Sequence, residues 1–160
     1  GFSDSFLRSN ISIAIVSIMM SLIMLFADFS TSKFINLNNH KYRNSLYIGI
    51  AQAFAIIPGV SRSGATISMA LLTGWERTDA AKFSFLLGIP AISLVAVVEF
   101  LSSINQFSAF PFLPLVLGLF TTFFSSLLAI KFLIKYISSN GLKIFIYYRL
   151  VFGALILLSL

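Results

Sequence analysis

Long apolar runs alternate with short polar stretches along the whole chain. Four of these runs have the length of a bilayer-spanning helix, which needs about 20 mostly apolar residues, and they cover residues 11–29, 83–101, 112–130 and 144–160. In lipid, an α-helix satisfies all of its backbone polar groups internally. The pattern therefore predicts an all-α polytopic membrane protein, with residues 1–160 in a single transmembrane domain and a kink at Pro90.

The apolar run at residues 46–72 differs from the other four because a polar turn interrupts it. Its first part, residues 46–57, is too short to span a bilayer, and Pro58-Gly59 then ends the helix. A second short apolar run covers residues 65–72. Two half-length helices around a polar turn are consistent with one broken crossing helix or with a re-entrant hairpin that enters and leaves on the same side.

The distribution of basic residues favours the hairpin. Lys33, Lys41 and Arg43 lie in the polar stretch at 30–45, and three more lysines lie at 131–143, so the positive-inside rule places both stretches in the cytoplasm. The uncharged stretch 102–109 is then outside. Counting back along the chain places the linker 74–82 inside as well. We therefore expect four spanning helices, one re-entrant hairpin at residues 46–74, and both chain ends outside.

Composition excludes several classes of function. Of the 160 residues, 58% are hydrophobic and only 10% are charged, which is too little charge to cover a soluble domain. The net charge is +6, but the basic residues are scattered beside apolar runs, so we expect no nucleic-acid binding. Without cysteine, and with His40 as the only histidine, a zinc site is excluded. We interpret His40 as a surface residue and Glu76 and Asp79 as solvated linker charges.

The chemistry is concentrated in the turn at residues 58–66, with the sequence Pro-Gly-Val-Ser-Arg-Ser-Gly-Ala-Thr. An arginine near the middle of a bilayer costs about 2.5–3.5 kcal/mol on insertion scales, so Arg62 needs a partner. One candidate is a carboxylate on a neighbouring helix, and Asp28 and Glu99 are the acidic residues near apolar runs. The other candidate is an anionic ligand.

The residues around Arg62 favour the ligand. Hydroxyl groups, two glycines that permit a sharp turn and close approach, and the N-terminus of a half-helix beginning near residue 64 surround it. Together with the guanidinium they predict an anion site, and phosphate fits it best. The predicted site consists of Ser61, Arg62, Ser63, Thr66, Gly59 and Gly64.

Residues 49–67 resemble the second signature of the bacitracin-resistance type of undecaprenyl-diphosphate phosphatase, Pro-Gly-x-Ser-Arg-Ser-Gly-x-Thr after a short helix. The stretch Phe-Ser-Phe-Leu-Leu at 83–87 and Tyr148-Arg149 with Gly153 are also similar to that family. The resemblance implies two inverted repeats, each with a re-entrant hairpin, in the cytoplasmic (inner) membrane of a bacterium. It implies cleavage of undecaprenyl diphosphate to the monophosphate that carries cell-wall precursors, which confers bacitracin resistance.

The same resemblance implies roles for individual residues. Arg62, Ser61 and Thr66 match the catalytic positions, with Ser63 close by. The family's first repeat carries Glu-Gly-x-x-Glu and Ser-Ser-Thr-Gly-His, which supply the carboxylates for a divalent cation, Mg²⁺ or Ca²⁺. Alignment of the repeats places Gln52 and Ile56 at the glutamate positions. The chain, which starts with glycine, is therefore interpreted as the C-terminal part of the enzyme, without the cation's carboxylate ligands.

Some alternatives stay open. Gln52 either hydrogen-bonds the turn or a phosphate oxygen, or it joins two helices without touching a ligand. Broken helices with inverted repeats also occur in secondary transporters, so a lipid-phosphate transporter or flippase is a second function. A third interpretation is a non-catalytic remnant. The expected partners are the polyprenyl diphosphate and the membrane, and a second copy of the chain in a homodimer is a further alternative.

Overall fold

The structure, a computed structural model, describes residues 8–30, 34–103 and 112–159. The elements in order are α2 (Asn10–Phe29), α3 (Tyr42–Ala53), the 3-10 turn η1 (Phe54–Ile56), α4 (Arg62–Leu72), α5 (Arg77–Ser103), α6 (Phe112–Asn140) and α7 (Lys143–Leu158). Within these ranges the only β-type pairing is one isolated bridge between Ile35 and Trp75. The predicted all-α class is confirmed.

Local chemistry sets several of the helix ends. α2 begins after Ser9, whose hydroxyl accepts a hydrogen bond from the Ser12 N–H at 3.2 Å, and α4 begins after Ser61 in the same manner. These serines satisfy N–H groups that have no partner inside the helix. Gly74 follows α4 with φ 92°, and Gly141 follows α6 with φ 70°, a conformation that favours glycine.

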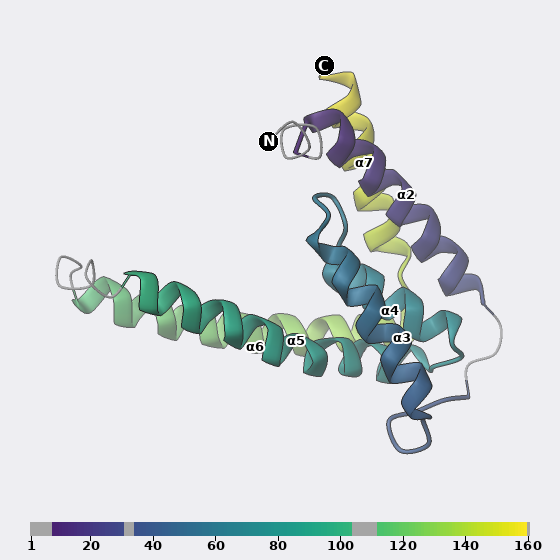
Figure 1. The fold of residues 1–160 in the computed structure, drawn as a ribbon, viewed down its shortest axis with the longest axis horizontal. Helices are drawn as coiled ribbons and strands as arrows, with labels where there is room; N and C mark the ends of the chain where they lie inside the picture. The colour runs from purple at the N-terminus through teal and green to yellow at the C-terminus, as the bar shows by residue number, and fades with distance from the viewer. Residues whose placement is uncertain (1–7, 31–33, 104–111, 160) are drawn as a thin grey trace.

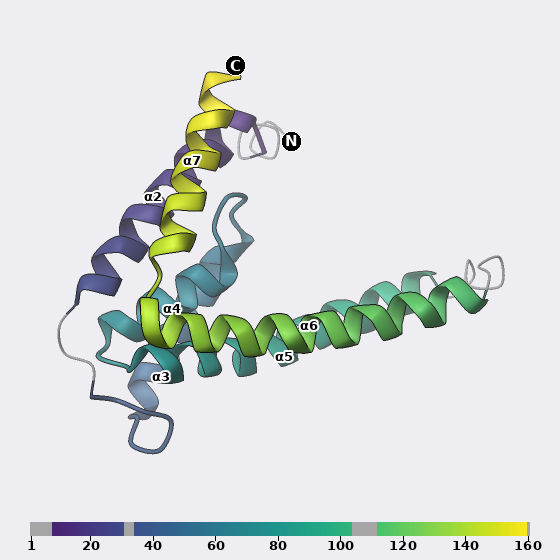
Figure 2. The same ribbon diagram turned by 180° about the vertical axis from the view of Figure 1, so that it is seen from behind.

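The helices form three groups in space (Figure 1). α2 and α7 lie side by side and run in opposite directions, while α5 and α6 form a long arm that projects to one side. The short helices α3 and α4 lie where the two groups meet, as the reverse view also shows (Figure 2). Gly153 of α7 lets the first pair approach closely, since a Cβ there would lie 2.7 Å from the Ile18 side chain.

The connections before α3 and after α4 meet at one end of the molecule. The N–H groups of Phe34 and Ile35 donate to the Gly74 carbonyl at 3.0 Å, and the Glu76 N–H donates to the Ile35 carbonyl at 2.8 Å. The α3–α4 pair is therefore a helical hairpin that starts and finishes at the same place. Such geometry suits a re-entrant hairpin, and its depth in a membrane stays a prediction.

A buried carboxylate joins three helix ends beside these connections. Asp28, in the last turn of α2, is 6% exposed and accepts from Arg77 Nε at 2.8 Å. A second Arg77 nitrogen donates to the Asp28 carbonyl at 3.1 Å, and the Leu142 N–H donates to Asp28 Oδ2 at 3.2 Å. A Cβ on Gly141 would lie 2.5 Å from the same Oδ2. This Asp28 joint ties α2 to the start of α5 and to the end of α6, which lie together at the base of the α5–α6 arm.

Three helices in the described part of the chain, α2, α5 and α6, are long and apolar enough to cross a bilayer. The protein is thus a multi-pass membrane protein. The fourth predicted run, 144–160, forms α7, whose 16 residues reach about 24 Å at 1.5 Å per residue. That is shorter than the roughly 30 Å hydrocarbon core of a typical bilayer.

Two predicted linkers are wrong in extent. α6 runs through Lys131 and Lys135 to Asn140, and α5 begins at Arg77, so most of the stretches 131–143 and 74–82 is helical. A helix longer than the bilayer can carry basic residues at its end, because long side chains reach back to the interface. The first hairpin arm also begins earlier, at Tyr42. The predicted outer linker 102–109 lies outside the described residues beyond Ser103.

The interpretation of two linker residues also changes. His40 is half-buried rather than a surface residue: its ring centroid lies 5.0 Å from that of Trp75, and its Nδ1 lies 2.9 Å from the Leu37 carbonyl. Asp79 accepts from the Leu37 N–H at 3.1 Å and from Lys82 at 3.0 Å, so it is bonded on both oxygens. Glu76 is exposed, as expected. The linker is therefore a packed connection.

Candidate anion-binding site

The turn between the hairpin arms rests against α2. Gly59 has φ 93°, and a Cβ at this position would lie 2.8 Å from the Ile13 carbonyl oxygen. An L side chain would meet both an unfavourable backbone conformation and a backbone atom of α2. Gly59 thus fixes the shape of the turn and its distance from α2.

Ser61 starts the second arm. Its backbone is extended, its hydroxyl accepts from the Gly64 N–H at 3.1 Å, and its carbonyl accepts from the Ala65 N–H at 2.8 Å. The N–H groups of Arg62 and Ser63 belong to the first turn of α4, which has no intrahelical acceptors for them. The Ser63 hydroxyl lies 3.5 Å from that of Ser61. Two hydroxyls and a positive helix end therefore share one small region.

A cavity of about 150 Å³ opens beside these two serines. Residues of α2, α4, α6 and α7 enclose it, among them Met24, Ser61, Ser63, Ile137, Tyr148 and Arg149. Most of this wall is apolar, and Arg149 is the cation in it. The predicted hydroxyls and the helix N-terminus thus share a cavity with an arginine that lies far along the chain.

Arg149 is the site residue that the motif analysis misses. One of its terminal nitrogens donates to the Gly59 carbonyl, and its Nε–H is buried without a hydrogen-bond partner in the described chain. An unpaired buried donor is costly, at about 1–3 kcal/mol or more for a charged group. The sequence offers two signals for it: a charged residue inside the last apolar run, which marks function by default, and the similarity of Tyr148-Arg149 to the family.

Arg62 lies on the other side of α4. Its Nη1 donates to the Gly88 carbonyl of α5 at 3.2 Å, and it borders a different hollow of about 580 Å³ that Lys82 also lines. A Cβ on Gly88 would lie 2.8 Å from both terminal nitrogens, so glycine makes room for the guanidinium. The predicted convergence of Arg62 with the serines is absent from this arrangement.

The expected carboxylate partners of Arg62 are used or placed elsewhere. Asp28 pairs with Arg77, and Glu99 is exposed near the far end of α5. In the described ranges, neither Arg62 nor Arg149 forms an ion pair. Two arginines without counter-charges thus flank the N-terminal turn of α4, which is the electrostatic requirement of an anion site.

Thr66 is 1% exposed and faces α5 rather than the cavity. Its hydroxyl lies 2.6 Å from that of Ser84 and also donates to the carbonyls of Arg62 at 3.0 Å and Ser63 at 3.2 Å. Ser84 and Gly88 of α5, one turn apart, therefore meet Thr66 and Arg62 of α4, also one turn apart. The two pairs fix the position of α4 on α5.

The remaining predicted residues lie behind the turn. A Cβ on Gly64 would lie 3.1 Å from Met24 Sδ, so this glycine admits a side chain of α2. Gln52 of α3 makes no hydrogen bond to the turn, and its buried Oε1 has no partner among the residues that the structure describes. Gly64 forms part of the wall of the cavity beside Ser61, whereas Gln52 does not border that cavity.

The donor set of this region does not suit a divalent cation. Mg²⁺ and Ca²⁺ prefer carboxylate and carbonyl oxygens, whereas the turn offers hydroxyls, guanidinium groups and backbone N–H groups. Within residues 8–30, 34–103 and 112–159, no group of three or more histidine or acidic side chains is close enough to hold a metal. The chemistry of the site is that of an anion receptor.

Several known proteins have sequences similar to this chain. The family model of the bacitracin resistance protein BacA matches residues 1–155. Undecaprenyl-diphosphatase of Prochlorococcus marinus subsp. pastoris (strain CCMP1986 / NIES-2087 / MED4) is 81% identical over the whole chain, which covers 60% of that protein. Undecaprenyl-diphosphatase of Synechococcus sp. (strain CC9311) is 46% identical over 98% of the chain and 56% of its own length.

The chain thus spans about 60% of the length of the most similar of these relatives. The match extends over both arms of the hairpin, the α5–α6 arm and nearly all of α7. This protein belongs to the bacitracin resistance protein BacA family.

Proposed function

We propose that the chain carries the diphosphate-binding part of an undecaprenyl-diphosphate phosphatase in the cytoplasmic membrane of a bacterium. The reaction hydrolyses the terminal phosphoanhydride bond of undecaprenyl diphosphate and returns undecaprenyl phosphate to cell-wall synthesis, which counters bacitracin. The observation that carries this proposal is the buried Nε–H of Arg149, which has no hydrogen-bond partner among the described residues and shares a cavity with Ser61 and Ser63. A phosphate oxygen satisfies such a donor.

The residues of the chain divide the work of binding between two sides of α4. Arg149, the hydroxyls of Ser61 and Ser63, and the N-terminal N–H groups of α4 bind one phosphoryl group. Arg62 is held by one carbonyl at 3.2 Å, and we assign it to the other phosphoryl group after its flexible side chain leaves Gly88. Two guanidinium groups then stabilise the charge that develops during phosphoryl transfer.

Thr66 acts indirectly in this proposal. Its hydroxyl is saturated by two carbonyls and Ser84, so it is a positioning residue that keeps the N-terminus of α4 in place. Gly59 and Gly64 position the turn and α2 in the same way, and Gln52 has no assigned contact with substrate.

A divalent cation and a second protomer remain part of the proposal. Mg²⁺ or Ca²⁺ would need carboxylates that this turn does not offer, so residues outside this chain would hold it and no step is assigned to it. The exposed apolar side chains of α5 and α6 support contact with lipid, with the part of the enzyme that this chain does not include, or with a second copy of the chain. Measurement of the mass of the purified protein in nanodiscs tests the homodimer.

The function is tested by phosphate release from undecaprenyl diphosphate, with Mg²⁺ or Ca²⁺ present. We expect little or no release by this chain alone, and release when it is co-expressed with the part of the Prochlorococcus marinus relative that it does not cover. Absence of rescue by that part, with both pieces present in the membrane, would contradict the proposal. Translocation of lipid phosphate in proteoliposomes without hydrolysis would instead favour a transporter.

A further inference from the structure

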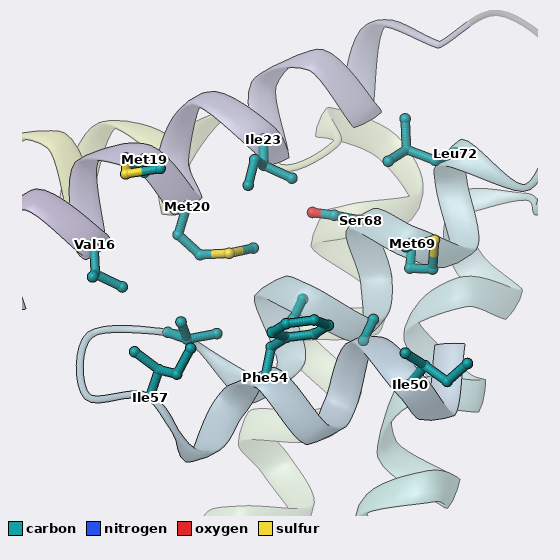
Figure 3. A pocket seen from close by; sticks show the side chains of 13 residues that line it. Val16, Met19, Met20, Ile23, Ile50, Phe54, Ile57, Ser68, Met69 and Leu72 are labelled. Carbon is teal, nitrogen blue, oxygen red and sulfur yellow. The ribbon is translucent and has the colours of Figure 1, made fainter. Parts of the chain in front are cut away.

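A second, almost wholly apolar cavity lies between α2 and the hairpin. Its volume is about 330 Å³, and Figure 3 shows side chains of α2, α3, α4 and the turn directed into it. Met20 and Ile23 come from α2, Phe54 and Ile57 from the hairpin's first arm and the turn, and Met69 from α4. Three methionines are among its lining residues, and methionine adapts readily to irregular apolar ligands.

Ser68 is the one polar side chain in this lining. It is 1% exposed, and its hydroxyl, which points into the cavity in Figure 3, has no hydrogen-bond partner in the described chain. Thr66 of α4 and Thr73, which follows the helix, bond back to carbonyls of the preceding turn, whereas Ser68 does not. The hydroxyl therefore remains available to the contents of the cavity.

The cavity reaches the anion-binding turn. Ile57 and Val60, which flank Pro58-Gly59, belong to its lining, and so does Ala65 in the first turns of α4. On α2, Met20 lines this cavity and Met24, one turn further along, lines the cavity that holds Arg149. The two cavities therefore border the same turn on either side of the contact between Met24 and Gly64.

Volume sets the size of a suitable ligand. A dry apolar cavity of about 150 Å³ accepts benzene, so a cavity of about 330 Å³ accommodates roughly twice as many carbon atoms or somewhat more. This corresponds to a hydrocarbon of about ten to fifteen carbons, or two to three isoprene units, by the same scaling.

We propose that this cavity binds the first isoprene units of the polyprenyl chain, next to the diphosphate at Ser61, Ser63 and Arg149. The inference rests on the proposed function and names the part of the substrate that the cavity takes. A prenyl chain suits it better than a saturated acyl chain, because each isoprene unit has a methyl branch and a double bond. The Ser68 hydroxyl can donate a weak hydrogen bond to those π electrons.

Binding to the chain in nanodiscs tests the inference with two ligands, farnesyl diphosphate and inorganic diphosphate. Ala51 lines the cavity and is 6% exposed, so Ala51→Phe fills it; Ala53, exposed on the same helix, provides Ala53→Phe as the matched control. We expect Ala51→Phe to weaken the binding of farnesyl diphosphate at least tenfold and to leave the affinity for inorganic diphosphate unchanged. Ala53→Phe should change neither affinity. An equal loss for both ligands, or no loss for either, would overturn the inference.

A saturated ligand separates the prenyl chain from bilayer lipid. Dodecyl diphosphate should bind several-fold more weakly than farnesyl diphosphate, and Ser68→Ala should reduce that difference. If the wild type binds the two ligands with equal affinity, and Ala51→Phe lowers both affinities equally, the cavity accepts any hydrocarbon chain. That result would contradict specificity for a prenyl chain.

Photolabelling with a neutral farnesol analogue needs neither a variant nor the anion site. We expect it to label cavity residues such as Phe54 and Met69, and excess farnesol to suppress the labelling. Failure of the wild type to bind either diphosphate, together with labelling in this cavity, would refute the proposed function and keep the prenyl site. Labelling confined to the exposed faces of α5 and α6 would refute the prenyl site itself.

Discussion

Arg77 at the start of α5 and Arg149 within α7 are both half-buried arginines, but their surroundings are opposite. Arg77 bonds the Asp28 carboxylate at 2.8 Å and the Asp28 carbonyl at 3.1 Å, in a joint that also holds the Leu142 N–H. Arg149 has no carboxylate partner in the described chain, and its Nε–H is unused. A cation with a buried counter-charge holds helices together, whereas a cation without one is available to an anionic ligand.

The same contrast separates the two ends of the hairpin. At the base, backbone hydrogen bonds join the connections before α3 and after α4, and the Asp28 joint ties α2 to the start of α5 and to the connection between α6 and α7. At the tip, the described groups include two arginines without counter-charges, two serine hydroxyls and the first N–H groups of α4. We therefore expect substitutions at the base to change stability, and substitutions at the tip to change ligand affinity.

Removal of the carboxylate from the Asp28 joint should have the largest effect. Asp28→Asn leaves the Arg77 guanidinium and its neighbours without their counter-charge, and breaking a buried pair on one side costs about 3–5 kcal/mol; we expect the lower value because Arg77 is about one-third exposed. Thermal unfolding in nanodiscs measures the change. Glu99→Gln, on the exposed far part of α5, should leave the unfolding temperature unchanged, and equal stability of both variants would contradict the role of the joint.

A side chain at Gly59 should have the next largest effect, this time at the tip. Gly59→Ala combines a left-handed backbone, which costs roughly 1–2 kcal/mol for an L residue, with a Cβ 2.8 Å from the Ile13 carbonyl. The turn must move away from α2, so we expect about tenfold weaker binding of inorganic diphosphate, by equilibrium dialysis. Gly49→Ala is the control, because a Cβ there meets nothing within 4 Å; unchanged affinity in Gly59→Ala would show that the turn geometry is not needed.

Removal of the hydroxyl contact between Thr66 and Ser84 should have the smallest effect on stability. Ser84→Ala leaves Thr66 with its two carbonyl acceptors, so we expect a loss of about 1 kcal/mol in stability, the usual net value of one hydrogen bond. Thr66→Val should cost a similar amount, and the double variant less than the sum, because the two hydroxyls share one contact. Additive losses in the thermal unfolding of the three variants would contradict a direct coupling.

The sequence predicts the local parts of this structure and misses its long-range contacts. The apolar runs predict the helical class, and Pro58-Gly59 followed by Ser61 predicts the turn and the start of α4, because these signals act within a few residues. The prediction of a loop at 131–143 is wrong, because lysines near a membrane interface are compatible with both a loop and a helix end. The Asp28 joint depends on a contact across 114 residues, which no local pattern contains.

The sequence predicts the types of residue that form the candidate site, but only part of their arrangement in space. Arg62 and Ser63 are adjacent in the first turn of α4 and point about 100° apart, so Ser63 borders the cavity while Arg62 faces α5. Ser61 precedes the helix in an extended conformation, which brings its hydroxyl to the same cavity as Ser63. The hydrogen bond from Arg149 to Gly59 joins residues 90 positions apart. The sequence alone supplied the charge of Arg149 within an apolar run and the similarity of Tyr148-Arg149 to the family, but no role for Arg149 in the site. The roles of Arg62, Ser61 and Thr66 in catalysis stay predictions.

Binding of inorganic diphosphate to Arg149→Lys and Arg77→Lys, with thermal unfolding of both, tests the central claim most directly. Lysine keeps the charge but loses the planar set of donors. We predict that Arg149→Lys weakens binding about tenfold, or about 1.4 kcal/mol, at nearly unchanged stability, and that Arg77→Lys lowers stability without changing affinity. Equal affinities in wild type and Arg149→Lys, or a loss of affinity only in Arg77→Lys, would contradict the assignment of the anion site to the hairpin tip.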